Sequence, residues 1–296
     1  MRSISNTADD PGRAMAPRRT GGARNRALDG LRGCLAVLVL IGHVIGEHDP
    51  QAHFYPAQVA VWLFFAISGL VLTRSWDGRY VAFLTRRFVR LWPLFALCIG
   101  AGYVLADAAP SLPLFLWIPA SNVPPAIDPP AWSLTIEAWA MLAMPLFAWI
   151  GRGSLIRLEL AIAAYVAAGF CDGRALFAAF FMIGAWLSRY EVRCWVLEHP
   201  VAQWLGRISY PLYLSHWLVL HYCPGPMALR VGLAFALAQA LTMTIERWSI
   251  AASRAVAARR AVLRNAGTLS QPLSALAGME GLEPPTPGFG DRCSTN

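Results

Sequence analysis

Long apolar runs separated by short polar segments dominate this sequence. An α-helix needs about 20 mostly apolar residues to cross a bilayer, and several runs reach that length. The runs that we interpret as membrane-spanning helices are residues 28–45, 57–73, 91–109, 132–150, 155–170, 175–187, 205–222 and 227–248. The fifth run carries Glu159 and the sixth is short, so the apolar pattern is weakest where it sets the number of spans within residues 151–222. The pattern predicts an all-α fold, a polytopic membrane bundle of about eight transmembrane helices.

Polar segments flank the apolar region at both ends. We therefore predict a basic, disordered N-terminus at residues 1–27, a transmembrane domain at 28–250 and a disordered tail at 251–296. The tail is rich in Gly, Pro, Ser and Thr, has no apolar periodicity, and resembles a read-through product toward its end. The N-terminal segment lacks the pattern of a cleaved signal peptide, so we expect the first apolar run to stay in the membrane.

Arginines alternate with arginine-free loops along the chain. The arginine-rich segments are residues 2–26, 74–90, 152–157, 189–193 and 254–264, whereas loops 46–56 and 110–131 contain none. Positively charged loops stay in the cytoplasm, so both termini should be cytoplasmic.

The composition agrees with a lipid-facing surface. The chain has 296 residues, of which 56% are hydrophobic and 14% charged, against about 25% charged residues in a soluble domain. The net charge of +8 does not indicate nucleic-acid binding, because the arginines lie between apolar runs rather than in one stripe. The six cysteines lack metal-ligand spacing, so we expect no metal site and no permanently bound cofactor.

Arg32 and His43 are candidate functional residues in the first predicted helix. Eleven residues make about three helical turns, so both side chains should lie on one face, about 16 Å apart along the axis. Arg32 then lies near the cytoplasmic surface and His43 near the outer one. Ionisable residues within a span are functional candidates, although a lone histidine there is more often a packing residue.

Glu137 lies early in the fourth predicted span, which runs inward from the outer side. We therefore expect it at the depth of His43. A carboxylate that faces an imidazole orients the ring and favours its protonated form, as general-base catalysis requires. We predict His43 and Glu137 as catalytic residues; the alternative is a structural buried pair.

Two further polar groups are candidates for ligand binding. Arg87 and Arg90 are spaced i, i+3 on one helix face, and arginines in this geometry suit phosphate groups; positive-inside topology with anionic lipid is the alternative. The segment around Tyr210 and His216 is polar for its depth, so these residues are predicted to bind substrate or to join helices by hydrogen bonds.

Five segments, in this order, resemble the membrane-bound acyltransferase family 3. The matching strings are LDGLRG…H at 28–43, FFAISGLVLT at 64–73, FLTRRFVRLWPLF at 83–95, WSLTIE at 132–137 and LGRISYPLYLSH at 205–216, and FMIGAWLSR at 181–189 is also similar. The family includes bacterial O-antigen, exopolysaccharide and nodulation-factor O-acetyltransferases. The resemblance covers residues 24–250.

The resemblance implies a function. The chain is then expected to transfer an acyl group, mostly acetyl, from acyl-CoA (acetyl-CoA) to a hydroxyl of a cell-envelope carbohydrate or other acceptor at the bacterial inner membrane. It further implies that Arg32, Arg87 and Arg90 hold the donor. His43, supported by Glu137, would deprotonate the acceptor hydroxyl, which then attacks the thioester.

One departure from the family leaves alternatives open. Family members usually have several more spans between the fourth and fifth strings, whereas residues 138–204 have room for few. The chain is thus either a compact member or an inactive, shortened one. A non-catalytic transporter is the remaining alternative, and it predicts an internal repeat with broken helices, which the sequence does not show.

Overall fold

The computed structural model describes residues 25–49, 51–52, 54–117, 127, 130–152, 155–169, 175–256 and 258. Its helices are α1 (Arg26–His48), α2 (Tyr55–Ser75), α3 (Tyr80–Leu105), α4 (Leu112–Phe115), α5 (Ala131–Leu142), α6 (Met144–Arg152), α7 (Leu155–Gly169), α8 (Ala175–Leu187), α9 (Pro200–Tyr222), α10 (Met227–Leu241) and the π-helical turn η1 (Thr242–Glu246). Every regular element in these ranges is helical, which confirms the all-α prediction. The predicted disordered ends lie largely outside the described residues, although the last helix continues past residue 250 to Val256.

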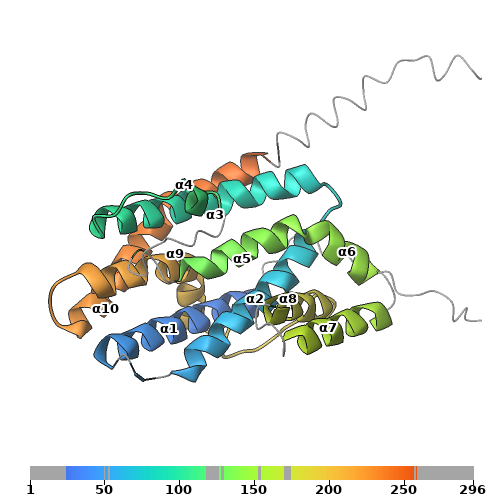
Figure 1. Ribbon diagram of the computed structural model, residues 1–296, viewed down its shortest axis with the longest axis horizontal. Helices are drawn as coiled ribbons and strands as arrows, with labels where there is room; N and C mark the ends of the chain where they lie inside the picture. Colours follow the sequence, from blue (N-terminus) through green and yellow to red (C-terminus); the bar gives the residue numbers. More distant parts are fainter. Residues whose placement is uncertain are drawn as a thin grey trace, which may run out of the picture.

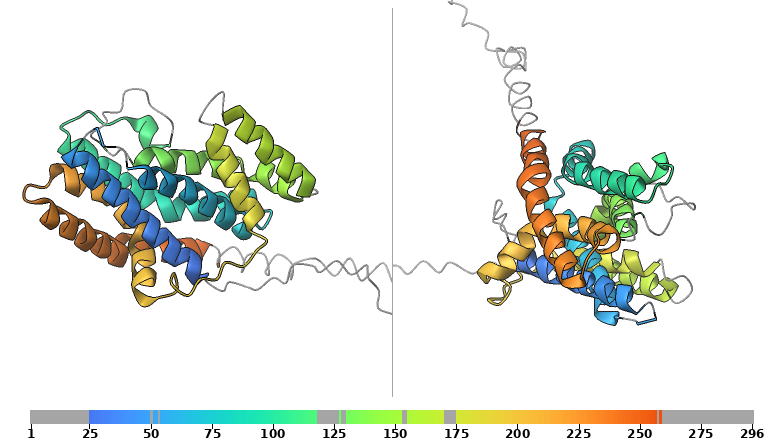
Figure 2. Two further views of the ribbon diagram at one scale, coloured as in Figure 1. Left: turned by 90° about the horizontal axis from the view of Figure 1, so that it is seen from below. Right: turned by 90° about the vertical axis from the view of Figure 1, so that its left-hand side faces the viewer.

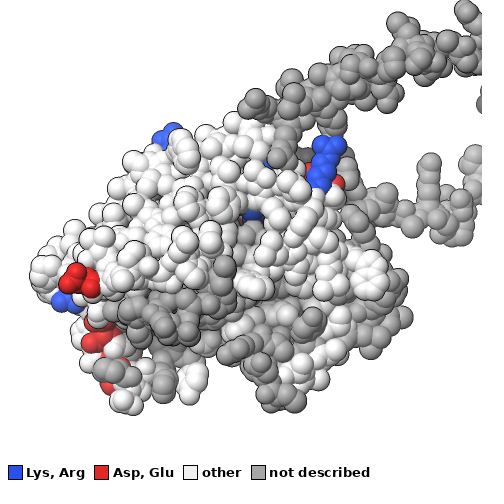
Figure 3. All heavy atoms as spheres, turned by 45° about the horizontal axis from the view of Figure 1, so that its top comes forward, with Lys and Arg blue, Asp and Glu red and all other residues white. Residues whose placement is uncertain are grey.

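The described helices fit a multi-pass membrane protein. By length and composition, α1, α2, α3 and the helix from Met227 to Val256 can each cross a bilayer. Figure 3 shows a face of the molecule on which charged side chains are few. The count of eight spans stays a prediction.

Two predicted helix limits differ from the structure. The third predicted span begins at residue 91, but α3 begins at Tyr80, because arginine continues a helix as readily as apolar residues do. Arg87 and Arg90 therefore lie inside α3. The fourth predicted span is two helices, α5 and α6, which separate at Ala143 because Pro145 has no backbone N–H to bond to the preceding turn.

The bundle brings distant parts of the sequence together. The N-terminal helix α1 contacts α9 and α2, and α2 in turn contacts α8. In addition, α10 packs against α9, and α7 packs against α8. Helix α5 contacts both α2 and α3 (Figures 1 and 2).

Glycines allow the two closest helix pairs to approach. A Cβ atom at Gly33 of α1 would lie 2.5 Å from the backbone nitrogen of Gly206 in α9. A side chain at Gly69 of α2 or at Gly184 of α8 would overlap a backbone carbonyl of the facing helix. Small residues serve this purpose in membrane bundles, where backbones pack directly against each other. The LDGLRG string therefore packs on LGRISY, and FFAISGLVLT packs on FMIGAW.

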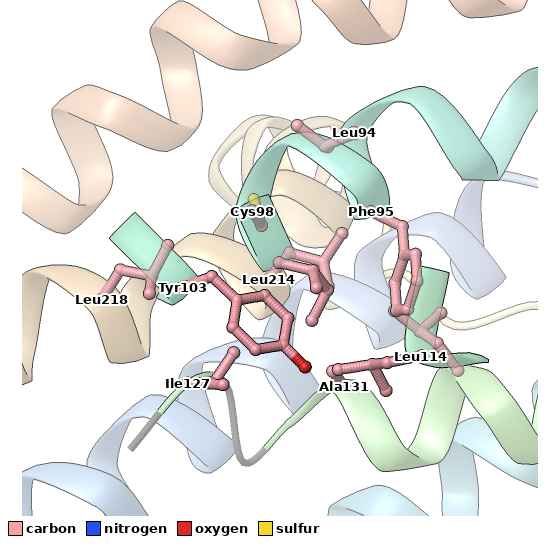
Figure 4. Close-up of a cluster of buried hydrophobic side chains, with 11 residues drawn as sticks. Leu94, Phe95, Cys98, Tyr103, Leu114, Ile127, Ala131, Leu214 and Leu218 are labelled. Atoms are coloured by element: carbon pink, nitrogen blue, oxygen red, sulfur yellow. The ribbon is translucent and has the colours of Figure 1, made fainter. Parts of the chain in front are cut away.

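A buried apolar cluster joins α3 and α9 with the start of α5 (Figure 4). Its members include Leu94, Phe95 and Cys98 of α3, Ala131 of α5, and Leu214 and Leu218 of α9. Tyr210 packs against this cluster from α9. The cluster fixes α9, with its polar residues, relative to α3 and its arginines.

Candidate functional site

A cavity lies where α1, α2, α5 and α9 meet. Its lining residues are Arg32, Phe64, Phe65, Ser68, Ser133, Leu134, Glu137, Ser209, Tyr210 and Tyr213. The space open to the centres of water molecules is about 40 Å³, enough for more than one water by the usual minimum of about 10–15 Å³. The structure therefore brings together Arg32, Glu137 and Tyr210, three residues predicted from sequence.

Arg32 has an unused hydrogen-bond donor. Its Nε is buried and, within the described part of the chain, has no hydrogen-bond partner. The adjacent Gly33 lets α9 approach, so Arg32 shares the cavity wall with Ser209 and Tyr210. A guanidinium carries five N–H donors and no acceptor, so an oxygen-rich anion is the ligand that best completes its bonds.

The arginines of α3 belong to the same charged cluster. Arg90 interacts electrostatically with Arg32 and Glu246, and Arg87 interacts with Arg90 and Glu137. Three guanidinium groups and two carboxylates thus interact electrostatically, and the excess positive charge favours an anionic ligand. Glu246 is 6% exposed on η1 and is absent from the predicted site, although an ionisable side chain within a predicted span is the signal that identifies it.

Arg87 is held by α2. Its Nη2 donates to Ser75 Oγ at 2.8 Å, and its guanidinium lies over the ring of Phe83 with 5.7 Å to the ring centroid. The neighbouring Arg86 points elsewhere and pairs with Asp77 at 3.3 Å. Of these two adjacent arginines, Arg87 is therefore the one that we assign to the charged cluster with Arg32 and Arg90.

Tyrosines of α9 connect it to α3 and α5. Tyr210 donates its hydroxyl to the carbonyl oxygen of Leu91 at 2.6 Å. The hydroxyl of Tyr213 lies 2.8 Å from Ser133 Oγ. Ser133 and Ser68 are cavity residues that the sequence analysis does not single out, although both are polar positions in apolar runs. The cavity walls are thus joined by hydrogen bonds from one helix.

His43 and His216 lie together, next to the cavity. Their ring centroids are 5.1 Å apart, and the ring of Trp217 lies 5.2 Å from that of His43. Tyr213 lines the cavity and its ring lies 6.3 Å from that of His216. A continuous line of side chains along α9 therefore leads from the Arg32 cavity to His43.

The predicted pair of His43 and Glu137 is absent. Among the described residues, His43 has ring contacts with His216 and Trp217, and no hydrogen bond or ion pair joins it to Glu137. Glu137 instead lines the cavity with Arg32. The catalytic roles of His43 and Glu137 stay predictions, but their environments differ from those expected.

Comparison with known proteins gives one match. The family model of the acyltransferase 3 family, described as an acyltransferase domain, matches residues 25–194. The match spans α1 to α8 and ends before α9, the helix that carries Tyr210 and His216. No curated protein and no solved structure matches the chain.

Proposed function

Since the chain belongs to the acyltransferase 3 family and is therefore an acyltransferase, we propose that it is a membrane-bound O-acyltransferase. The proposed donor is acyl-CoA, with acetyl-CoA as the first choice, and the proposed acceptor is a hydroxyl of a cell-envelope carbohydrate. The proposed location is the bacterial inner membrane, with both termini and the arginine cluster toward the cytoplasm. The observation that carries the proposal is the excess positive charge of Arg32, Arg87 and Arg90 beside a cavity that Arg32 lines together with polar side chains of α2, α5 and α9.

The arginine cluster has the chemistry to hold the donor. Coenzyme A carries phosphate groups, which accept paired hydrogen bonds from guanidinium donors. Arg32 offers a buried donor without a partner among the described residues. Glu137 neutralises part of the charge and would keep the arginines in position between turnovers. The acyl-carrying arm would then extend along the cavity wall past Tyr210 toward His43.

His43 has the position of a general base in this scheme. It lies eleven residues beyond Arg32, about 16 Å farther along α1, so donor phosphates and reacting atoms would occupy separate parts of one path. One ring nitrogen of His43 would take the proton of the acceptor hydroxyl as its oxygen bonds to the acyl carbon. The carbon–sulfur bond then breaks, and the proton passes to the leaving thiolate. The products are an ester and a free thiol.

The proposal is tested by acyl transfer in membrane vesicles. Vesicles that contain the full chain are given acetyl-CoA labelled in the acetyl group, and both thiol release and label in the envelope glycan fraction are measured. His43→Ala should lose about 10²–10⁴-fold in rate, the usual contribution of a general base. His48→Ala is the matched control, because His48 lies on the same helix and, among the described residues, its side chain bonds to the carbonyl of Val44.

Two results would contradict the proposal. Wild-type vesicles that release no thiol and label no glycan would favour an inactive, shortened family member. Equal rates for wild type and His43→Ala would remove His43 from the chemistry. Mass spectrometry of envelope glycans from a deletion strain would identify the acceptor by its missing acyl group.

A further inference from the structure

His216 has a defined tautomer. Its Nδ1 lies 2.8 Å from the carbonyl oxygen of Leu212, one turn earlier in α9. A carbonyl oxygen only accepts hydrogen bonds, so Nδ1 must carry the hydrogen. In the neutral ring, Nε2 then has a lone pair and can only accept.

The accepting nitrogen of His216 is buried and unused. The residue is 0% exposed, and Nε2 has no hydrogen-bond partner within the described residues. Because Nδ1 bonds to the backbone of α9, Nε2 lies on the edge of the ring that points away from that backbone. The closest imidazole is that of His43 on α1, with 5.1 Å between ring centroids.

Two polar groups near the two histidines have other partners among the described residues. Tyr213, one turn before His216, directs its hydroxyl to Ser133 and the carbonyl of Pro130. Glu47, one turn after His43 on α1, interacts electrostatically with His43, lies 3.2 Å from Nδ1 of His221, and as a carboxylate has no hydrogen to donate to Nε2. The ring of His43 is therefore the group best placed to supply a hydrogen for Nε2.

We infer that His216 orients His43 by accepting a hydrogen bond from its ring N–H through Nε2. This inference rests on the proposed function and assigns His216 the role of a positioning residue. The bond would fix one tautomer of His43, with the hydrogen toward His216 and the lone pair on the opposite ring nitrogen. That second nitrogen would face the acceptor hydroxyl. In triads of this kind, the third group holds the base in the correct tautomer and is not itself the base.

The role differs from the one predicted for Glu137. A carboxylate would orient His43 and stabilise its charged form, whereas a neutral imidazole only accepts a hydrogen bond. Glu137 lines the cavity beside Arg32 and Glu47 pairs with His221, so His216, whose ring contacts that of His43, offers the accepting nitrogen for the orienting bond.

Two amide variants separate the accepting nitrogen from the rest of the ring. His216→Gln places an amide oxygen near the position of Nε2 and keeps an acceptor there. His216→Asn reaches only the position of Nδ1, so it keeps a donor for the carbonyl of Leu212 but has no acceptor toward His43. Both variants are polar, so their costs of burial are similar. Their amounts in the membrane and their melting temperatures in detergent check that both fold.

The readout is thiol release from acetyl-CoA in vesicles that contain the full chain. His216→Asn should lower kcat about 10²-fold or more, the lower range for a general base, with little change in KM for acetyl-CoA. His216→Gln should stay within about tenfold of wild type. Ser215→Ala, next to His216 on α9 and bonded to the carbonyl of Pro211, is the control and should resemble wild type.

Each outcome decides a separate question. Equal rates for Gln and Asn at position 216, with an active wild type and an inactive His43→Ala, would overturn the orienting bond and leave the proposed function in place. A change in KM alone would also overturn it, since that result assigns His216 to substrate binding. An inactive wild type would overturn the proposed function and the inference together.

Discussion

The contact of Gly33 with α9 leads to a sharp prediction for Gly33→Ala. A Cβ atom there would lie 2.5 Å from the nitrogen of Gly206, whereas ordinary contact begins at 3.4 Å. The neighbour is backbone and cannot rotate away, so α1 and α9 must separate by about 1 Å. The cavity residue Arg32 is adjacent, and a displacement of about 1 Å can reduce catalysis about 10²-fold. We therefore expect Gly33→Ala to insert into the membrane but to release thiol from acetyl-CoA about 10²-fold more slowly.

Gly46→Ala is the matched control. Gly46 lies on the same helix, and no atom of the described residues facing it lies within 4 Å of a Cβ atom built there. Both substitutions raise helix propensity by about the same amount, about 1 kcal/mol. The rates are compared per amount of chain in the vesicles. Wild-type activity in Gly33→Ala, or an equal loss in Gly46→Ala, would refute the link between this contact and the site.

Two further predictions concern the polar residues of the site. Arg87→Ala should raise KM for acetyl-CoA about 10–100-fold, because a hydrogen bond to a charged group contributes about 1.5–3 kcal/mol. Arg86→Ala should change KM by less than about threefold, since Arg86 pairs with Asp77 at the surface; equal effects of the two variants would contradict the assignment. Tyr210→Phe removes the bond to the carbonyl of Leu91 and should lower the free energy of unfolding by about 1 kcal/mol, measured by thermal melting in detergent. An unchanged melting temperature would show that this bond does not hold α9 on α3.

The helices were predictable from sequence, and their ends less so. Apolar runs located α1, α2, α8 and α10, and the runs of α1 and α2 have the length that a membrane-spanning helix needs. The start of α3 was predicted too late because polarity does not end a helix. The break after α5 depends on Pro145, whose missing N–H acts even within an apolar run.

The charged half of the site was predictable, and its partners were not. Arg32, Arg87, Arg90 and Glu137 stood out because ionisable groups in a span are costly. The expected contact of Glu137 with His43 rested on depth alone. The structure instead places Glu137 in the cavity with Arg32, about 16 Å from the level of His43 along α1, so the depth expected for Glu137 was wrong. The rotation of α5 directs Ser133 and Glu137 into the Arg32 cavity.

The role of His216 required atomic positions. Sequence marked the segment around it as polar, but a histidine can donate or accept from either nitrogen. Only the bond to Leu212 identifies Nε2 as the acceptor. The contact of Gly33 with Gly206 could not be predicted either, because the sequence does not show which residue of another helix faces a glycine.

The pairing of α1 with α9 has a consequence for biosynthesis. Helices leave the ribosome in order, so α1 enters the membrane long before Pro200–Tyr222 has been translated. During that interval the glycine face of α1 lacks the helix that packs against it. Chains that stop before α9 should therefore lack the main packing partner of α1, so that complete translation is a condition for a stable bundle.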